Sequence, residues 1–282
     1  MNVSDAINSA VEVLRESGVA EYRREAASLL AFVLDKDDVF VFAHPEHLLT
    51  PEQTDSYASV VNRRAAREPF QYIVGSQEFY GLSFHVTPDV LIPRPETEVL
   101  VEAAIAAIAE LEDPALLEIG VGSGCISVAI LHSVPGTRAV GVDVSPAALA
   151  VARFNAETHG VIDRFELKRG DVFAGLTGRF SLIVSNPPYV PETQLELLQA
   201  EVRQYEPYTA LSGGTTGLDV IERIAADAQH FLIPSGVLLM EIGFDQSERV
   251  ARLFERDIWY ELSFLPDLQG IPRILFARTF GH

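Results

Sequence analysis

The stretch Ala-Leu-Leu-Glu-Ile-Gly-Val-Gly-Ser-Gly at residues 115–124 decides the fold class of this chain of 282 residues. Its first half is an apolar run containing the acidic Glu118, and its second half carries three alternating glycines before a helical pattern begins. Glycine lets the backbone turn sharply and approach a ligand closely, and a following helix presents free N–H groups. The pattern is typical of the first strand, loop and helix of a nucleotide-binding domain. A plain strand-to-helix turn has the same pattern and stays open as an alternative.

Apolar strands alternate with helical stretches on both sides of this motif. The predicted strands are 115–120, 138–143, 165–171, 180–186 and 237–243, and the predicted helices are 125–133, 146–159, 217–231 and 245–256. Such alternation predicts an α/β fold with a parallel, doubly wound sheet. The segments 259–267 and 272–280 are predicted to form a final antiparallel pair, which brings the sheet to seven strands.

The first 70 residues differ in character, because they show helical periodicity and no strand pattern. Apolar residues recur at helical spacing over 7–14 and 26–33, and the polar run DKDD interrupts the pattern at 35–38. Thr50-Pro51-Glu52-Gln53 has the form of a capping box, so a third helix is expected to begin there. We therefore predict a small all-helical domain of three helices over 1–70 that docks a substrate.

A hairpin linker is predicted between the two domains, over 71–92. Aromatic and β-branched residues surround Tyr80-Gly81 in this segment, and that dipeptide is the expected turn. The run from Pro93 to Glu98 stops the segment and starts a new helix with acidic residues in its first turn. The α/β domain is therefore predicted over 93–282.

The composition is acidic. Asp and Glu number 40 against 21 Lys and Arg, which gives a formal net charge of -19, and 48% of the residues are hydrophobic. The hydrophobic content supports a sizeable core, and the charge disfavours a broad surface for nucleic acid or anionic membrane. Because Cys125 is the one cysteine, neither an internal disulfide nor a multi-cysteine metal site is possible. Without a secretory signal or a membrane-length apolar run, a soluble cytoplasmic protein is expected.

The second predicted strand ends in Asp143, about 20 residues past the glycines. In doubly wound folds an acidic residue at this point accepts hydrogen bonds from ribose hydroxyls, although Asp143 could also simply start the helix at Ser145-Pro146. Both features fit NAD as well as S-adenosylmethionine. A dinucleotide loop needs glycine at position 125, where Cys125 stands, so a single nucleoside without pyrophosphate is favoured.

The fourth predicted strand leads into Asn186-Pro187-Pro188-Tyr189. Two prolines supply carbonyl acceptors without N–H donors and stiffen the backbone. The Asn186 amide oxygen and a proline carbonyl could then accept two hydrogen bonds from one NH2 group, with the Tyr189 ring beside a planar substrate. The motif predicts a site for a planar, conjugated nitrogen, as in a carboxamide or an aromatic amine. A rigid turn that ends the strand is the structural alternative.

These motifs together resemble the HemK/PrmC family, the release-factor glutamine methyltransferases, within the S-adenosylmethionine-dependent amino-methyltransferases. The resembling segments run in the family's order over most of residues 70–280. They are EFYGLSFHV (78–86), LIPRPETE (91–98), EIGVGSGC (118–125), GVDVSP (141–146), IVSNPPYV (183–190), YEPYTAL-SGG-TTGL (205–218) and DLQGIPR (267–273). One departure is Glu118, where many members have aspartate; the charge is the same.

The resemblance implies a class I methyltransferase domain that binds S-adenosyl-L-methionine. It places Glu118 near the ammonium of the cofactor, Asp143 on the ribose, and Asp171 and Val172 beside the adenine. The loop residues Gly120, Val121, Gly122, Ser123 and Gly124 would contact the methionine portion. Asn186 would also contact the cofactor. Asn186 and the Pro187 carbonyl would hold the NH2 group of a substrate glutamine next to the cofactor, with Pro188 and Tyr189 completing the substrate pocket. Asn186, Pro187 and Tyr189 are the catalytic residues so implied.

The implied reaction is methylation of the glutamine in the Gly-Gly-Gln motif of class-1 peptide chain release factors. An amide nitrogen is a poor nucleophile, because its lone pair is delocalised into the carbonyl. Two acceptors on its hydrogens would orient it and raise its electron density, so that alignment and electrostatics supply most of the catalysis. No general base is assigned. The expected partner is a protein, with no nucleic acid or membrane, and the chain is expected to be a monomer.

Several other residues are weighed and left outside the site. His44 and His47 lack a third metal ligand and are expected to be a surface pair, Cys125 a small buried residue, and Glu241 structural. Arg94 lies between prolines and has no role that the sequence assigns. Arg63, Arg64 and Arg67 cluster at the end of the third helix and predict one local basic patch in an otherwise acidic chain.

Two alternative functions remain. A nucleic-acid adenine methyltransferase would use the same Asn-Pro-Pro-aromatic motif on an exocyclic amine, but would need phosphate contacts that a net charge of -19 disfavours. A nucleotide-binding oxidoreductase, or a binding module without catalysis, is disfavoured by Cys125 in the loop and by the motif at 186–189. The acidity also predicts that a basic or ribosome-associated protein binds more weakly as salt rises.

Overall fold

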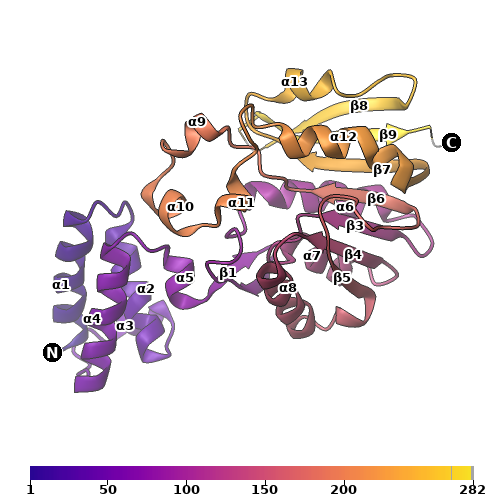
Figure 1. Cartoon of the computed structure of the whole chain (residues 1–282). Helices are drawn as coiled ribbons and strands as arrows, with labels where there is room; N and C mark the ends of the chain where they lie inside the picture. The colour runs from indigo at the N-terminus through magenta and orange to yellow at the C-terminus, as the bar shows by residue number, and fades with distance from the viewer. Residues whose placement is uncertain (268, 281–282) are drawn as a thin grey trace. The chain divides into compact units, whose positions relative to one another are not determined.

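The chain is described by a computed structural model over residues 1–267 and 269–280 (Figure 1). By contact it forms two compact units. The helical unit comprises Met1–Ser76 together with Gln199–Tyr205, and the sheet unit comprises Gln77–Leu198 together with Glu206–His282. The helical unit thus takes in a short segment from far along the chain.

The helical unit has the helices α1 (Val3–Glu16), α2 (Tyr22–Leu34), α3 (Asp38–Ala43), α4 (Pro51–Ala65), α5 (Phe70–Val74) and α10 (Ala200–Tyr205). The apolar faces of the longer helices meet in one core, in which Leu14, Leu29 and Leu30 are fully buried. The capping box is confirmed, since Thr50 Oγ1 accepts from Gln53 N at 3.2 Å and Thr50 N donates to Gln53 Oε1 at 2.9 Å.

The prediction of three helices is wrong in number, because α3 and α5 are additional. At six and five residues they are too short to show periodicity. The polar run at 35–38 contains the start of α3 rather than a simple break: Asp37 Oδ1 accepts from Phe40 N at 2.8 Å and caps the helix.

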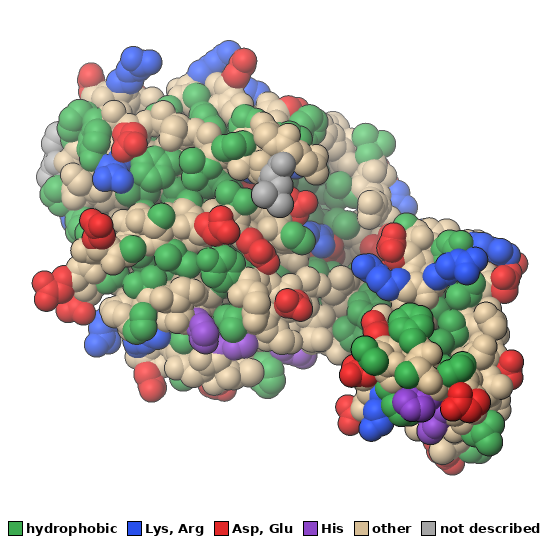
Figure 2. Space-filling model, turned by 180° about the vertical axis from the view of Figure 1, so that it is seen from behind, with side chains coloured by type: hydrophobic (Ala, Val, Ile, Leu, Met, Phe, Trp, Pro, Cys, Tyr) green, Lys and Arg blue, Asp and Glu red, His purple; other side chains and the backbone are tan. Residues whose placement is uncertain are grey.

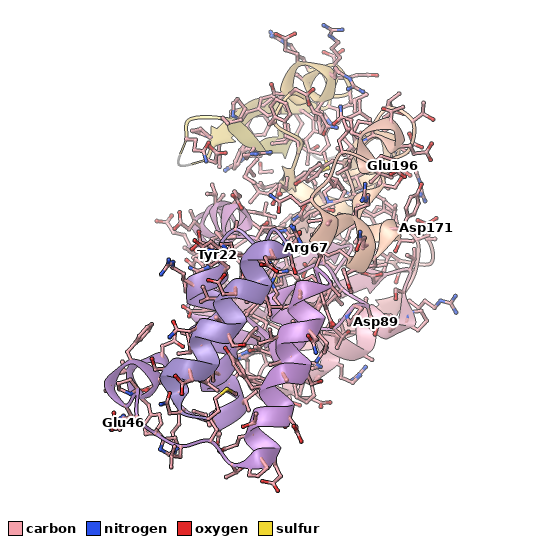
Figure 3. The ribbon with its side chains drawn as sticks, turned by 90° about the vertical axis from the view of Figure 1, so that its left-hand side faces the viewer. Tyr22, Glu46, Arg67, Asp89, Asp171 and Glu196 are labelled. Carbon is pink, nitrogen blue, oxygen red and sulfur yellow. The ribbon has the colours of Figure 1, made fainter. Side chains whose placement is uncertain are left out.

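The three arginines near the end of α4 do not form an unpaired basic patch. Arg63 is paired with Glu68, and the buried Arg64 is paired with Glu25 and Glu201. Arg67, which follows α4 (Figure 3), is bidentate to Glu201 at 2.7 and 2.8 Å. Acidic side chains are scattered over the surface that Figure 2 draws. Ion pairing within the helical unit therefore offsets the positive charge that the sequence pattern emphasises.

The sheet unit begins with the hairpin of β1 (Ser76–Phe79) and β2 (Leu82–His85). Tyr80 and Gly81 have φ of +51° and +71°, as a two-residue primed turn requires, so the predicted hairpin turn is confirmed. The helix predicted to begin after Pro93 is the 3-10 turn η1 (Pro95–Thr97) followed by α6 (Glu98–Ile108).

The main sheet has seven strands among the described residues, in the order β5-β4-β3-β6-β7-β9-β8. The strands are β3 (Ala115–Ile119), β4 (Arg138–Asp143), β5 (Phe165–Arg169), β6 (Phe180–Ser185), β7 (Leu232–Glu241), β8 (Trp259–Pro266) and β9 (Pro272–Thr279). The pairings among β3 to β7 are parallel, and β9 is antiparallel to both β7 and β8. This confirms the doubly wound sheet and its antiparallel end.

Helices cover both faces of this sheet. Besides η1 and α6, the helical segments of the sheet unit are α7 (Cys125–Ser133), α8 (Pro146–Thr158), η2 (Ile162–Arg164), α9 (Glu192–Leu195), α11 (Tyr208–Leu211), α12 (Asp219–Phe231) and α13 (Ser247–Ala251). Leu116 packs into the core beneath α6, α7 and α8, and its neighbour Leu117 packs into the core beneath α12 and α13. Successive residues of a strand point to opposite faces, so the central strands carry apolar residues on both faces.

Two predicted boundaries are wrong. The helix predicted over 245–256 spans only Ser247–Ala251, and the strand predicted from 237 begins at Leu232. Residues 234–236, Pro-Ser-Gly, have turn chemistry that hides the start of this strand in the sequence.

The chain winds from β3 through β4 to β5 in one direction, and β6 then pairs with β3 on its other side. The carboxyl ends of β3 and β6 therefore lie at the point where the strand order reverses. Open α/β sheets bind their ligands at such a point.

Candidate active site

A cavity lies at the carboxyl ends of β3, β4 and β6. Ten of the residues predicted for the site line it: Glu118, Gly120, Val121, Gly122, Ser123, Asp143, Asp171, Val172, Asn186 and Pro188. The remaining predicted residues, Gly124, Pro187 and Tyr189, are not among its lining. The segments 89–97 and 207–210 contribute further walls that the sequence analysis did not assign.

The glycine loop is held in a conformation that suits glycine. Gly120, Gly122 and Gly124 have φ of +74°, +52° and +79°, in the left-handed region where a side chain adds strain. A Cβ on Gly124 would also lie 3.2 Å from the Cβ of Ala152 in α8. Asn155 Nδ2 donates to Ser123 O at 2.8 Å and anchors the loop. The loop therefore packs tightly against α8 on one side and borders the cavity on the other.

Glu118 is buried at the base of the cavity with one carboxylate oxygen unpaired. Its Oε2 accepts from Ser127 N at 3.0 Å in the first turn of α7, whereas Oε1 has no partner among the described residues. Burial raises the pKa of Glu118 to about 8, and the negative charge of Asp143 adds to the rise. A buried acceptor without a donor fits a cationic ligand group, such as the ammonium that the sequence predicts here.

Asp143 holds two turns together at the carboxyl end of β4. Its Oδ2 accepts from Gly122 N at 2.9 Å, and its Oδ1 accepts from Ser145 N at 2.9 Å. It thus supports the start of α8 while it lines the cavity. Each carboxylate oxygen can accept a second hydrogen bond, which leaves capacity for the hydroxyls of a ribose.

Asp171 and Val172 follow β5 at the cavity wall. Asp171 (Figure 3) forms an ion pair with Arg223 of α12 at 2.8 Å, and this pair is partly exposed. Val172 is buried with φ of +55°, which is rare for a β-branched residue. Strained backbone of this kind persists where the surroundings hold it in place, and it is frequent at ligand sites.

Asn186 lies where β6 ends beside the glycine loop. Ser185 Oγ donates to Ile119 O at 2.8 Å and ties the ends of β6 and β3 together. The ideal Cβ position on Gly120 is 4.0 Å from Asn186 O, so the two motifs are adjacent. Asn186 Nδ2 donates to Thr97 Oγ1 at 3.2 Å, and Oδ1 accepts no hydrogen bond from the described part of the chain.

Thr97, Glu241 and Tyr189 form a hydrogen-bonded network behind Asn186. Thr97 Oγ1 donates to Glu241 Oε2 at 2.7 Å, and the Tyr189 hydroxyl donates to Glu241 Oε1 at 3.3 Å. Burial raises the pKa of Glu241, and the two hydroxyl donors and the positive charge of Arg273 oppose the rise. Burial likewise raises the pKa of the Tyr189 hydroxyl. The sequence analysis missed Thr97, because a threonine at a helix start is ordinarily a cap.

Arg94 joins two walls of the cavity. Its guanidinium pairs with Glu206, whose other carboxylate oxygen accepts from Ile92 N at 3.2 Å. The Glu206 side chain is almost fully buried and the Arg94 side chain is one-third exposed. Arg94 therefore links the segment before η1 to the segment before α11, a role that only the folded structure reveals.

Cys125, His44 and His47 are predicted from the sequence to lie outside the catalytic machinery. Cys125 is buried, and burial raises the pKa of its thiol to about 12, so little of it is ionised at neutral pH. His44 and His47 pack on Phe40 in the helical unit, with ring centroids 4.4 and 5.3 Å apart. The described residues contain no group of three or more His, Cys, Asp and Glu side chains placed to hold a metal ion. No helix within 1–267 and 269–280 is long and apolar enough to cross a membrane.

Two family models match the chain. The PrmC N-terminal domain matches residues 5–75, and the methyltransferase small domain matches residues 96–204.

Full-length relatives are also found. A "Release factor glutamine methyltransferase" of Geobacter sulfurreducens is 46% identical over 266 residues, which cover 94% of this chain and 92% of that protein. One of Cereibacter sphaeroides with the same name is 42% identical over 280 residues, covering 99% of each.

Solved structures of low identity share the fold. The hMettl16 catalytic domain in complex with an RNA hairpin superposes with a TM-score of 0.59 at 15% identity, covering 83% of each chain. The 16S rRNA N2 G1207 methyltransferase RsmC of T. Thermophilus superposes with a TM-score of 0.53 at 21% identity, covering 72% of this chain and 49% of that one. These likenesses show a Rossmann-like methyltransferase fold.

Proposed function

The chain belongs to the family of release factor glutamine methyltransferases, and from that premise we propose that it methylates the side-chain amide nitrogen of a glutamine in a peptide chain release factor, with S-adenosyl-L-methionine as methyl donor. The observation that carries the proposal is the placement of Asn186. Its Nδ2 is engaged by Thr97, and its amide borders the cavity beside the glycine loop. An amide so engaged has its oxygen available for the NH2 group of a substrate.

The cavity residues suit the cofactor. Glu118 offers an unpaired carboxylate oxygen to an ammonium group, and Asp143 has acceptor capacity for ribose hydroxyls. Asp171 and Val172 line the same cavity and are proposed to flank the adenine, and the positive φ values of the glycine loop keep its cavity side free of Cβ atoms. When bound, the cofactor supplies a methyl group on a positively charged sulfur, which makes that methyl group electrophilic.

The residues of this chain contribute orientation and electron density to the reaction. Asn186 Oδ1 and the Pro187 carbonyl would accept the two hydrogens of the substrate amide and direct its nitrogen. Acceptors on both hydrogens raise the electron density on nitrogen, and alignment of the reacting groups supplies most of the rate. We assign no general base, because the nitrogen becomes acidic enough to lose a proton once it is methylated.

Class-1 release factors, with the glutamine of their Gly-Gly-Gln motif, are the expected partners, and the helical domain predicted over 1–70 is the expected docking module. We propose that the chain acts in the cytoplasm, because translation termination takes place there, and that it acts as a monomer. A direct nucleic-acid partner is not proposed, since a net charge of -19 disfavours phosphate contacts.

The experiment that tests the proposal follows a labelled methyl group. The protein is incubated with S-adenosylmethionine labelled in the methyl group and, in parallel, with a class-1 release factor or with DNA. Label on the glutamine side chain of the release factor is the expected result. Label on DNA would favour the adenine-methyltransferase alternative, and label on neither would contradict both.

A further inference from the structure

We propose that Thr97 and Glu241 are positioning residues that determine which end of the Asn186 side-chain amide faces the substrate, and that they thereby select glutamine over glutamate. This inference rests on the proposed role of Asn186 as an acceptor for the substrate NH2 group. Neither residue is predicted for the site from the sequence, and Glu241 is interpreted there as structural. The inference follows from the hydrogen bonds behind Asn186.

The two ends of an asparagine amide have the same shape and opposite hydrogen-bonding capacity. The oxygen accepts hydrogen bonds, and the nitrogen donates two. A substrate glutamine presents an NH2 group and therefore needs the oxygen of Asn186. A glutamate presents acceptors only and would be held by the nitrogen. Rotation of this amide by half a turn would thus reverse the preference of the site, so the orientation of Asn186 must be held from behind.

Thr97 holds that orientation through the direction of its one hydroxyl proton. Thr97 Oγ1 lies 2.7 Å from Glu241 Oε2 and 3.2 Å from Asn186 Nδ2. Because the proton is donated to the carboxylate, only lone pairs remain for Asn186. A lone pair can be met by the nitrogen end of the amide and is repelled by the oxygen end. Thr97 is 2% exposed, so bulk water competes little for these bonds.

Glu241 fixes the direction of that proton because it accepts at both oxygens. The Tyr189 hydroxyl donates to Glu241 Oε1, and the positive charge of Arg273 favours the ionised carboxyl. Burial acts in the other direction and raises the pKa of Glu241, so these donors are needed to keep it an acceptor. The order of donation is thus Tyr189 and Thr97 to Glu241, and Asn186 to Thr97.

The network joins residues that are distant along the chain, and it reaches one wall of the cavity. Thr97 belongs to η1, Asn186 follows β6, and Glu241 ends β7. Thr97 and Asn186 line the cavity, whereas Glu241 lies behind them. Thr97 and Glu241 therefore act on the substrate through Asn186.

The test compares Thr97→Val, which keeps the shape and removes the hydroxyl, with Thr97→Ser, which keeps the hydroxyl. Two readouts are taken. One is kcat for methylation of a class-1 release factor. The other is the affinity, in the presence of S-adenosylhomocysteine, for that release factor and for a form carrying glutamate in place of the motif glutamine. Thr158→Val, which removes a hydroxyl on an exposed position of α8, is the matched control and should equal the wild type.

We expect Thr97→Val to lower kcat by about 10- to 100-fold and to reduce the discrimination against the glutamate form by about tenfold, with S-adenosylhomocysteine affinity unchanged. Thr97→Ser should restore most of both quantities. A merely structural role would lower stability and leave the choice between glutamine and glutamate as it is. Wild-type discrimination in Thr97→Val, or equal losses in the serine and valine variants, would overturn the inference.

A second variant keeps the test valid if Thr97→Val does not fold. Glu241→Gln replaces an acceptor by an amide that can donate to Thr97, so it should reduce the discrimination in the same direction. If Glu241→Gln keeps the full discrimination, the inference is wrong. Asn186→Ala separates this failure from that of the proposed function. High turnover in Asn186→Ala would contradict the role of Asn186 itself, whereas loss of turnover there with no effect at Thr97 would contradict only the positioning network.

Discussion

Cofactor binding is expected to release a proton from Glu118. Burial raises the pKa of this carboxyl from its usual 4.5 to about 8, so the free protein holds the proton at neutral pH. An ammonium group against the unpaired Oε1 would stabilise the ionised form and lower the pKa of Glu118 again. The affinity for a ligand with this ammonium should therefore rise with pH below about 8.

The size of the effect follows from the pKa. At pH 6.5 a group with a pKa of about 8 is about 97% protonated, so binding should release close to one proton. The dissociation constant should fall about ninefold between pH 6 and pH 7, where the ligand ammonium itself stays protonated. The raised pKa also implies that the free protein loses stability as pH rises from 4.5 through 8, because the unfolded chain has already lost this proton.

Isothermal titration calorimetry measures the proton directly. S-adenosylhomocysteine, which binds without turnover, is titrated at pH 6.5 in buffers of different ionisation enthalpy, and the slope of the observed enthalpy gives the proton number. Glu118→Gln keeps the shape and the bond from Ser127 N but cannot titrate, so its proton number should be near zero. Methylthioadenosine, which carries the nucleoside without the amino-acid part, should release no proton from the wild type.

Two results would refute this reasoning. A proton number near zero for the wild type would mean that Glu118 is already ionised in the free protein or does not meet the ammonium. A proton number near one that persists in Glu118→Gln would mean that another group titrates.

Three further outcomes are expected. Asn186→Ala should lower methyl transfer by about 10²- to 10³-fold while S-adenosylhomocysteine binds normally in calorimetry, and near-normal turnover would contradict its assigned role. Gly124→Ala, at φ of +79°, should lower the free energy of unfolding by about 1–2 kcal/mol, seen as a lower Tm; an unchanged Tm would count against the strain. Arg64→Ala leaves the partly buried Glu25 without its partner and should destabilise the helical unit by about 3 kcal/mol in hydrogen exchange of α2 and α4, whereas the more exposed Arg63→Ala should cost about 0–1 kcal/mol. Equal losses in the two arginine variants would contradict that account.

The sheet unit could be predicted from the sequence because its strands are buried on both faces and its loops carry glycine or proline. The apolar run before Glu118 and the turn residues after it specify a strand, a loop and a helix locally, without information from distant residues. The same holds for the hairpin at Tyr80-Gly81, whose two positive φ values define the turn. Local chemistry sufficed at each of these places.

Other features depend on contacts between distant residues and could not be predicted. Thr97 meets Asn186 and Glu241 across 89 and 144 positions of the chain, and nothing in its own segment distinguishes it from a helix cap. Glu201 lies far along the chain, and it pairs with Arg64 and Arg67 of the helical unit. The helix α3 could not be predicted because its six residues are too few to show a helical periodicity of apolar positions.

The amide chemistry of the site is the central claim, and mass spectrometry of the methylated substrate tests it most directly. A class-1 release factor is incubated with the protein and S-adenosylmethionine, digested, and fragmented to locate each added methyl group. We predict one methyl group on the side-chain nitrogen of the glutamine in the Gly-Gly-Gln motif, and none on a release factor that carries glutamate there. A methyl group on any other residue, or on the glutamate form to a similar extent, would contradict the account.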